Sequence, residues 1–355
     1  MPTVTDVLTL DARRPDPAGI SRAAALLRAG ALVAFPTETV YGLGAHALDV
    51  EAVRRIFAAK GRPPDDPLIV HVHDDSQLRQ LAADVPPAVA RIASRFWPGP
   101  LTIVLPRAER VPPEVTAGLD TVAIRVPAHP IALALLAAAG IPVAAPSANL
   151  FSRPSPTRAG HVLQDLGGRI DLVIDGGPTD VGIESTVLDL TGEAPTILRP
   201  GAITLEMIRA ILPDARMRDG ASRSEPGMKS PGLLAKHYSP RAPLTLYEGP
   251  PEAVAARIAA DVGQALANGQ RVGLLAANED SLAAGSIDGL YVQKLGSERD
   301  LSAIAANLYN ALRLLDTAQV DLIATRTFGG EAGLAVTIND RLRRAAAGRV
   351  VFLDN

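Results

Sequence analysis

The amino-acid sequence predicts an α/β protein with two regular regions separated by an irregular stretch. In residues 18–211, short apolar segments alternate with amphipathic segments of helical period, and the connections between them are short. The alternation returns after residue 243, where it indicates a smaller parallel sheet. A chain of 355 residues has room for about two domains. We therefore predict domains at 1–212 and 243–355, joined by a linker at 213–242.

Local signals define the elements of the first region. The helix expected at 18–30 has Ile20, Ala24 and Leu27 on one face and ends at a glycine. The strand expected at 31–35 is apolar and is followed by a proline. The same criteria predict further strands at 68–72, 101–105, 122–126, 142–145, 172–174 and 186–190, and further helices at 50–59, 76–83, 87–96, 129–139, 157–166 and 204–211.

The second region contains the same kinds of element. Its pattern predicts strands at 243–247, 271–276, 290–295 and 320–325, and helices at 251–268, 300–317 and 333–346. The helix at 300–317 has the clearest signal, because Ile304, Leu308 and Leu312 lie on one apolar stripe. Strands that alternate with helices predict a small Rossmann-like α/β unit.

Composition excludes several classes of protein. With 47% hydrophobic and 21% charged residues, the chain has ordinary globular usage. The absence of cysteine excludes disulfides, thiolate nucleophiles and cysteine-ligated metals. A formal net charge of −3 provides no whole-chain basic footprint for nucleic acid. The most apolar stretch, 131–145, is too short to span a bilayer, and the N-terminus does not resemble a secretory signal, so we expect a soluble cytoplasmic protein.

The stretch at 213–242 differs from both regions. It is rich in glycine, proline, serine and charge, and it has no apolar period. Residues 211–240 hold five basic and three acidic side chains, which leaves a net charge of +2. Connections longer than about 12–15 residues usually carry function or disorder. We predict that 214–240 forms a lid over the active site of the first domain; the alternative is a flexible tether.

Polar residues gather where the predicted strands end, which is where small ligands bind in open α/β sheets. In segment 35–44, threonines and a glutamate precede two glycines that let the backbone approach a ligand closely; an ordinary turn is the alternative. Lys60 and Arg62 put two cations on one tight loop, which can hold a polyphosphate; a solvated helix C-terminus is the alternative. Ser147 and Asn149 follow another strand.

Two further residues lie inside predicted strands. Arg125 lies in an apolar strand, so it needs a paired anion, either a side chain or a bound carboxylate. His71, as a lone histidine, is more typical of a structural residue than of a catalyst. The sequence contains no P-loop motif and no zinc-ligand motif.

Taken together and in order, these motifs resemble those of the threonylcarbamoyl-AMP synthases of the YrdC type, in their longer two-domain form. Lys60, Arg62, Ser147 and Asn149 match the K-x-R…S-x-N signature of that family. The segments PTETVYGLG, GIESTV, LRPG and SPG…HYSP are further matches. The resemblance implies a YrdC-like twisted open mixed sheet with helices, followed by the smaller Rossmann-like domain.

The resemblance also implies a reaction. L-threonine, bicarbonate or CO2, and ATP would give threonylcarbamoyl-AMP and pyrophosphate, and a downstream tRNA threonylcarbamoyl transferase machinery would use the product. Such a reaction needs no protein nucleophile or general base, so Lys60 and Arg62 would act by positioning. Mg²⁺ is expected on the phosphates of ATP, and the resemblance leaves its protein ligands open.

Residue roles follow from the match to the family motifs. The L-threonine site would comprise Thr39, His71, Arg125, Ala145 and Ser185. The ATP site would comprise Lys60, Arg62, Asp66, Thr121, Ser147, Asn149, Ser155, Arg199 and Tyr238. Asp66 departs from the pattern, because the family often has asparagine there. A negative charge near ATP is unfavourable unless Asp66 meets Mg²⁺ or a cation.

Two other classes of function stay open. YrdC-like domains also serve as double-stranded RNA or tRNA binders, against which the 22 acidic and 19 basic side chains of residues 1–210 argue. The fold also occurs as a carbamoyl-transfer domain in hydrogenase-maturation proteins, whose zinc-finger segments need cysteines that this chain lacks. Direct tRNA binding and the oligomeric state are not determined by the sequence.

Overall fold

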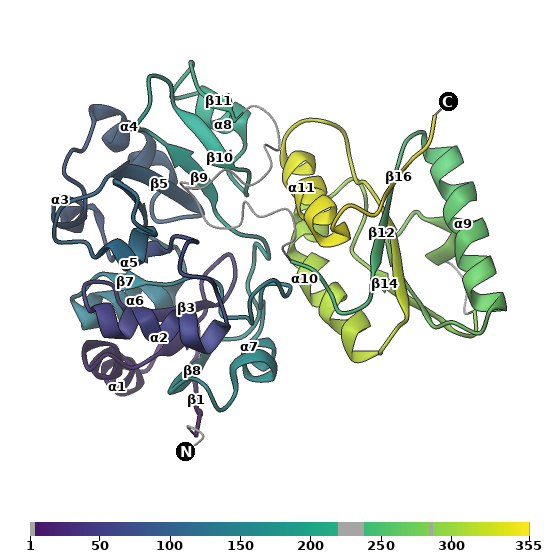
Figure 1. Ribbon diagram of the computed structural model, residues 1–355. Helices are drawn as coiled ribbons and strands as arrows, with labels where there is room; N and C mark the ends of the chain where they lie inside the picture. Colours follow the sequence, from purple (N-terminus) through teal and green to yellow (C-terminus); the bar gives the residue numbers. More distant parts are fainter. Residues whose placement is uncertain (1–3, 219–237, 284–286, 355) are drawn as a thin grey trace. The chain divides into compact units, whose positions relative to one another are not determined.

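The computed structural model describes residues 4–218, 238–283 and 287–354. These residues form two compact α/β units (Figure 1). The first unit contains residues 4–151 and 155–218. The second contains the remaining described residues, including the short segment 152–154. Most of the predicted lid falls on 219–237, outside the described residues.

The first unit is built on a mixed sheet of eleven described strands, in the order β1-β8-β2-β3-β7-β4-β6-β5-β9-β10-β11. The strands are β1 (Asp6–Thr9), β2 (Val33–Phe35), β3 (Gly42–His46), β4 (Ile69–His71), β5 (Leu101–Pro106), β6 (Thr121–Arg125), β7 (Val143–Ala144), β8 (Leu172–Asp175), β9 (Thr186–Asp189), β10 (Thr196–Arg199) and β11 (Arg216–Met217). The helices are α1 (Pro17–Arg28), α2 (Val50–Lys60), α3 (Leu78–Leu81), α4 (Pro87–Phe96), α5 (Pro113–Thr116), α6 (Pro130–Ala139), α7 (Ala159–Leu166) and α8 (Leu205–Arg209), with a 3-10 turn η1 (Asp75–Gln77). Parallel and antiparallel pairs both occur, which confirms the predicted open mixed sheet.

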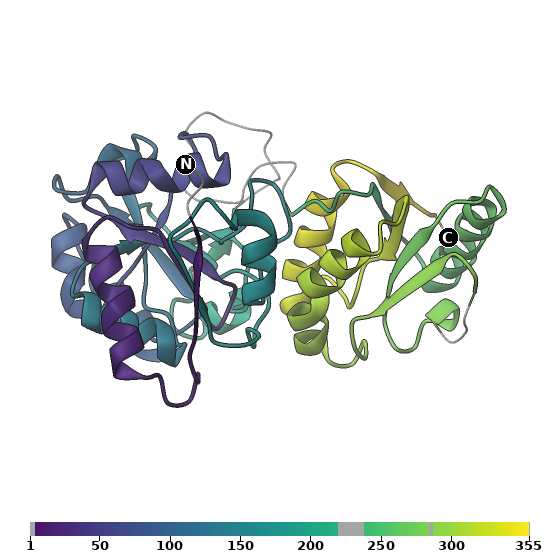
Figure 2. The ribbon, with the colours of Figure 1, turned by 90° about the horizontal axis from the view of Figure 1, so that it is seen from below.

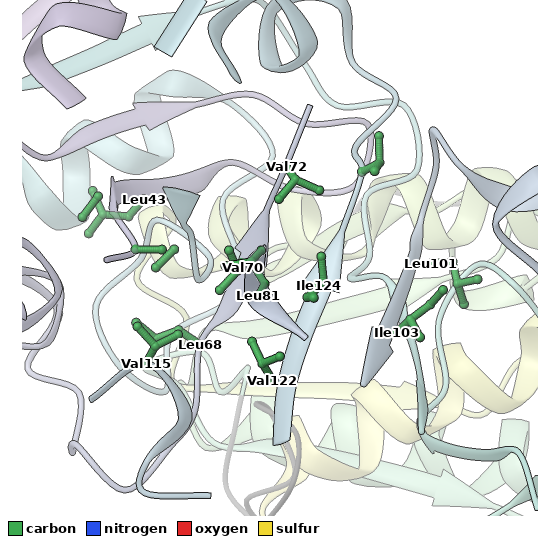
Figure 3. Close-up of a cluster of buried hydrophobic side chains, with 14 of the residues drawn as sticks. Leu43, Leu68, Val70, Val72, Leu81, Leu101, Ile103, Val115, Val122 and Ile124 are labelled. Atoms are coloured by element: carbon green, nitrogen blue, oxygen red, sulfur yellow. The ribbon is translucent and has the colours of Figure 1, made fainter. Parts of the chain in front are cut away.

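The central strands β4, β5 and β6 have one face in the main core, and their other face carries buried polar residues beside a second, small apolar cluster. Val70, Ile103 and Ile124 lie in register on these strands and belong to one buried apolar cluster (Figure 3). Their neighbours along the chain, which include His71 and Arg125, are also in register with one another. Because side chains alternate between the two faces of a strand, these polar residues lie on the opposite face from the cluster.

Strand β3 was not among the predicted strands. Gly42–His46 is a buried strand between β2 and β7, and the approach of a ligand to its glycines stays a prediction. A Cβ atom on Gly44 would lie 2.8 Å from the ring of Phe35 and 2.9 Å from Val143. Glycine is therefore required at residue 44, because the side chains of Phe35 and Val143 occupy the space that a Cβ atom would need.

The second unit is a five-stranded parallel sheet in the order β14-β13-β15-β12-β16. Its elements are β12 (Leu244–Glu248), α9 (Pro251–Ala267), β13 (Val272–Ala276), η2 (Ser281–Ala283), β14 (Leu290–Lys294), α10 (Leu301–Thr317), β15 (Leu322–Arg326), α11 (Leu334–Ala346) and β16 (Val350–Phe352). Helix α9 covers one face, and α10 and α11 cover the other (Figure 2), so the unit is Rossmann-like as predicted. In α10, Ile304, Leu308 and Leu312 are buried on the predicted stripe.

Segment 152–154 belongs to this second unit, although it lies in the first half of the chain. Arg153 forms an ion pair of 2.9 Å with Asp316, and Arg313 donates a hydrogen bond to the Pro154 carbonyl. The amide of Ser239 donates to the Ser152 carbonyl at 2.8 Å. Among the described helices of both units, none is long and apolar enough to cross a membrane.

The packing of β3 generates a stability prediction. Gly44→Ala should lower the free energy of unfolding by roughly 1–3 kcal/mol, because a methyl group there overlaps two buried side chains. Gly160→Ala in α7 is the control, since no heavy atom outside its own helix lies near the added methyl group. Urea unfolding followed by circular dichroism measures both. Equal stability of the two variants would contradict this account of β3.

Candidate functional site

Arg125 meets its anion inside the protein. Its Nη2 atom lies 2.6 Å from Oε1 of Glu38, and both side chains are buried. The second oxygen of Glu38 accepts a hydrogen bond of 3.0 Å from the amide of Ala128. Arg125 Nε donates to the Gly99 carbonyl at 3.3 Å. The cation therefore has a side-chain partner, and Glu38 is a residue that the sequence-based site did not include.

His71 lies beside Arg125 as a neutral side chain. The two residues are register partners on β4 and β6, and the imidazole is buried, with Nδ1 at 3.3 Å from the Ile69 carbonyl. Burial, together with the positive charge of Arg125, lowers the pKa of His71 to about 3. A histidine with so low a pKa is uncharged at neutral pH and is a weak base.

Ser185 connects Arg125 to a second buried arginine. Thr102 on β5 is in register with Arg125, and its hydroxyl lies 2.8 Å from the Ser185 hydroxyl. Arg199 at the end of β10 donates to the Ser185 carbonyl at 2.9 Å and to its hydroxyl at 3.2 Å. All four residues are buried. The structure thus places a residue predicted for L-threonine in contact with one predicted for ATP.

The other two residues predicted for L-threonine lie on neighbouring elements. Thr39 directly follows Glu38, and its hydroxyl is 2.8 Å from that of Thr37. Ala145 follows β7, and its amide donates to the Ile69 carbonyl at 2.9 Å. We use the name Arg125 cluster for the polar residues of this face: Glu38, Thr39, His71, Thr102, Arg125 and Ser185.

Lys60 is buried, so it is not the solvated end of a helix. It is the last residue of α2, and its Nζ atom donates to the carbonyls of Ser147 and Asn149 at 2.5 and 2.6 Å. The αL conformation of Gly61 then turns the chain out of the helix. Lys60 thereby joins the two halves of the K-x-R…S-x-N signature.

Arg62 and Asp66 form a second buried ion pair. Arg62 Nη2 lies 3.0 Å from Asp66 Oδ1 and 2.7 Å from the Pro67 carbonyl. The Oδ2 atom of Asp66 is buried and has no hydrogen-bond partner among the described residues. Burial raises the pKa of Asp66, and the positive charges of Arg62, Lys60 and Arg199 act in the opposite direction. The unusual carboxylate at residue 66 therefore meets a cation.

The remaining residues predicted for ATP lie in different parts of the chain. Ser155 donates to Glu184 Oε1 at 2.5 Å, and both are buried, so Glu184 is another polar residue absent from the predicted site. Thr121 lies four residues before Arg125 on β6 and therefore on the same face. Tyr238 belongs to the second unit, where Arg341 lies over its ring and Tyr309 packs against it. Its contact with a nucleotide stays a prediction.

Buried cations and hydroxyls gather beside the mixed sheet, an arrangement typical of the class of α/β proteins that bind small anionic molecules. Comparison with known families agrees. Residues 25–201 match the Sua5, YciO and YrdC family, described as telomere recombination. Residues 203–347 match the family described as threonylcarbamoyl-AMP synthase, C-terminal domain. The chain belongs to the two-domain threonylcarbamoyl-AMP synthase family.

Individual relatives match over nearly the whole chain. The threonylcarbamoyl-AMP synthase of Bacillus subtilis is 48% identical over 349 residues, which are 98% of this chain and 97% of that protein. The synthase of Pyrococcus abyssi is 46% identical over 93% of this chain and 94% of its own length. The crystal structure of P. abyssi Sua5 complexed with L-threonine superposes with a TM-score of 0.91 and 44% identity, covering 98% of this chain and 100% of that one.

The environment of His71 generates a pH prediction. Its folded pKa lies below the ordinary 6.5, so between these values the unfolded chain binds a proton that the folded chain excludes. The contribution to stability is complete above pH 6.5 and falls on acidification, by up to about 1.4 kcal/mol per pH unit. His71→Gln should reduce this slope between pH 6.5 and 4, as measured by urea unfolding. Identical slopes for wild type and His71→Gln would refute the assignment.

Proposed function

We propose that this chain is an L-threonylcarbamoyladenylate synthase, which converts L-threonine, bicarbonate and ATP into threonylcarbamoyl-AMP and pyrophosphate. The observation that carries the proposal is that Arg199 donates to Ser185, whose hydroxyl lies 2.8 Å from that of Thr102, the register partner of Arg125. Joining an amino-acid carbamate to a nucleotide requires two anion-binding groups side by side. Relatives that match over nearly the whole chain are named for this activity.

The proposed chemistry relies on positioning. The ammonium group of threonine and bicarbonate give the carbamate, one water and one proton. A carbamate oxygen then attacks the α-phosphorus of ATP, and pyrophosphate leaves. Fixed cations that neutralise the developing charge supply the catalysis, so no nucleophilic side chain is required.

The proposed substrate sites comprise two groups of residues. We assign L-threonine to the Arg125 cluster, with Ala145 at its edge; the P. abyssi relative was crystallised with this amino acid. We assign the nucleotide to Lys60, Arg62, Asp66, Thr121, Ser147, Asn149, Ser155, Arg199 and Tyr238. Lys60 holds the 147–149 loop through two carbonyls, so its role in this assignment includes shaping the loop as well as adding charge.

We propose Mg²⁺ as the ion that accompanies ATP. No cluster of three or more histidine, aspartate or glutamate side chains suited to a metal occurs in the described residues, which fits an ion held largely by phosphates. The buried Oδ2 atom of Asp66 is the oxygen that fits the remaining need for a protein ligand. The ion would neutralise phosphate charge during the transfer.

Threonylcarbamoyl-AMP must be used by a second enzyme. We propose that a tRNA threonylcarbamoyl transferase machinery in the cytoplasm takes up threonylcarbamoyl-AMP, because this mixed anhydride is hydrolysable and cannot accumulate. The predicted lid would exclude water from the adenylate, although it lies mostly outside the described residues.

The activity is tested directly with the full chain. Pyrophosphate release should require L-threonine, bicarbonate and ATP together, and mass spectrometry should detect threonylcarbamoyl-AMP. Omission of each substrate in turn is the control. Release that is independent of threonine or bicarbonate would exclude the synthase. No release, combined with tight binding of double-stranded RNA, would favour the RNA-binding alternative.

Lys60 has its own test. Lys60→Met should lower the rate of adenylate formation at least tenfold and lower the melting temperature, since charged hydrogen bonds contribute about 1.5–3 kcal/mol each. Lys60→Arg should restore only part of the rate, because a planar guanidinium differs in shape from an ammonium group. Lys294→Met, at an exposed position on β14, is the matched control. A Lys60→Met variant of near wild-type rate would remove Lys60 from the site.

A further inference from the structure

We infer that Glu38 determines which small molecules enter the Arg125 cluster, by setting its charge to that of a zwitterion. This inference rests on the proposed binding of L-threonine there. Glu38 would favour an α-amino acid, which carries a carboxylate and an ammonium group, over an acid of the same size without the ammonium group. Its role is positioning and selection, distinct from any catalytic step.

The Glu38 carboxylate is held in a fixed position. One of its oxygens accepts from Arg125 and the other from the amide of Ala128. The Glu38 carbonyl also accepts from the amide of Val181 at 2.8 Å. Three loops, which contain Glu38, Ala128 and Val181, are therefore tied together at this residue. A buried carboxylate held at both oxygens is a fixed charge.

Arg125 has one nitrogen atom, Nη1, that can contact a substrate. Its Nε and Nη2 atoms donate to Gly99 and Glu38, whereas its Nη1 atom makes no hydrogen bond to any described residue. Nη1 is therefore the group that can receive a substrate carboxylate. A carboxylate bound there has the fixed negative charge of Glu38 on the neighbouring side of the guanidinium. An ammonium group next to the substrate carboxylate is the natural partner of that charge.

The charges of Arg125, Glu38 and His71 sum to zero. Arg125 contributes +1, Glu38 contributes −1, and His71 is neutral because its pKa is lowered to about 3. A zwitterion keeps the balance at zero, whereas a monoanion adds an uncompensated charge to a buried site, which is costly. Arg199 also contacts the cluster, through its hydrogen bond to the Ser185 hydroxyl. In the proposed function the phosphates of the nucleotide balance its charge, so it is left out of this balance. Without Glu38, the cluster would carry +1 and would attract a simple carboxylate.

The inference is tested by calorimetry on the full chain with two probes. The probes are L-threonine and 2,3-dihydroxybutyrate, in which a hydroxyl replaces the ammonium group. The wild-type protein should prefer threonine at least tenfold. Glu38→Gln should weaken threonine binding at least tenfold and bind dihydroxybutyrate as well as or better than wild type, so that the preference approaches one. ATP affinity should stay within twofold.

Matched variants separate charge from shape. Asp189→Asn removes another buried carboxylate of the same unit, outside both assigned sites, and should leave the preference for threonine unchanged. Glu38→Asp keeps the charge with a shorter side chain, so it should weaken both probes while retaining the preference. Thermal melting checks that each variant is folded.

The binding measurements distinguish failure of the Glu38 inference from failure of the proposed function. An unchanged preference in folded Glu38→Gln would overturn the inference and leave the proposed function standing. If Glu38→Gln does not fold, Glu38→Asp is compared with the wild type: equal affinity of the wild type for both probes, or loss of the preference in folded Glu38→Asp, would overturn the inference. Failure of the wild-type protein to bind threonine at all would instead reject the proposed function, and the inference with it.

Discussion

A guanidinium in the middle of a sheet is the constraint around which this site is organised. Arg125 lies on β6, one residue along from side chains that build the apolar core. Burial of that charge is tolerable only with a fixed partner, and Glu38 supplies it from a loop 87 residues earlier in the chain. The ion pair therefore links distant loops before any substrate arrives, and it keeps one edge of the guanidinium available.

The same principle recurs at Lys60 and Arg62, which are proposed to bind the nucleotide. Lys60 and Arg62 are both buried, and each is satisfied by groups of its own chain, two carbonyls in one case and a carboxylate with carbonyls in the other. Preorganised cations of this kind need little rearrangement during a reaction. Arg125 and Arg62 are thus paired with buried carboxylates, and Lys60 is bound by carbonyl groups. Ser185 accepts from Arg199 and lies 2.8 Å from Thr102, the register partner of Arg125.

Much of this architecture can be predicted from the sequence, because the long elements have strong periodicity. Helix α10 and the central strands were predicted within a few residues. Strand β3 was missed because two glycines in five residues resemble a turn, whereas the glycine at 44 is required by side chains of distant strands. Glu38 was missed as the partner of Arg125 because no local pattern encodes a contact across the sheet. The motif match selected polar residues that the structure buries, but it could not reveal that Lys60 supports the 147–149 loop through two carbonyls.

The short segment 152–154 limits which parts of the gene can be exchanged by recombination. It lies between Asn149 and Ser155, two residues assigned to the nucleotide, yet its own contacts are with Asp316, Arg313 and Ser239 of the second unit. The two units are consequently not interchangeable modules. A recombination event that replaced the C-terminal half with that of a distant relative would also have to preserve partners for three residues encoded far upstream. Selection should therefore act on the two halves of the gene as one unit.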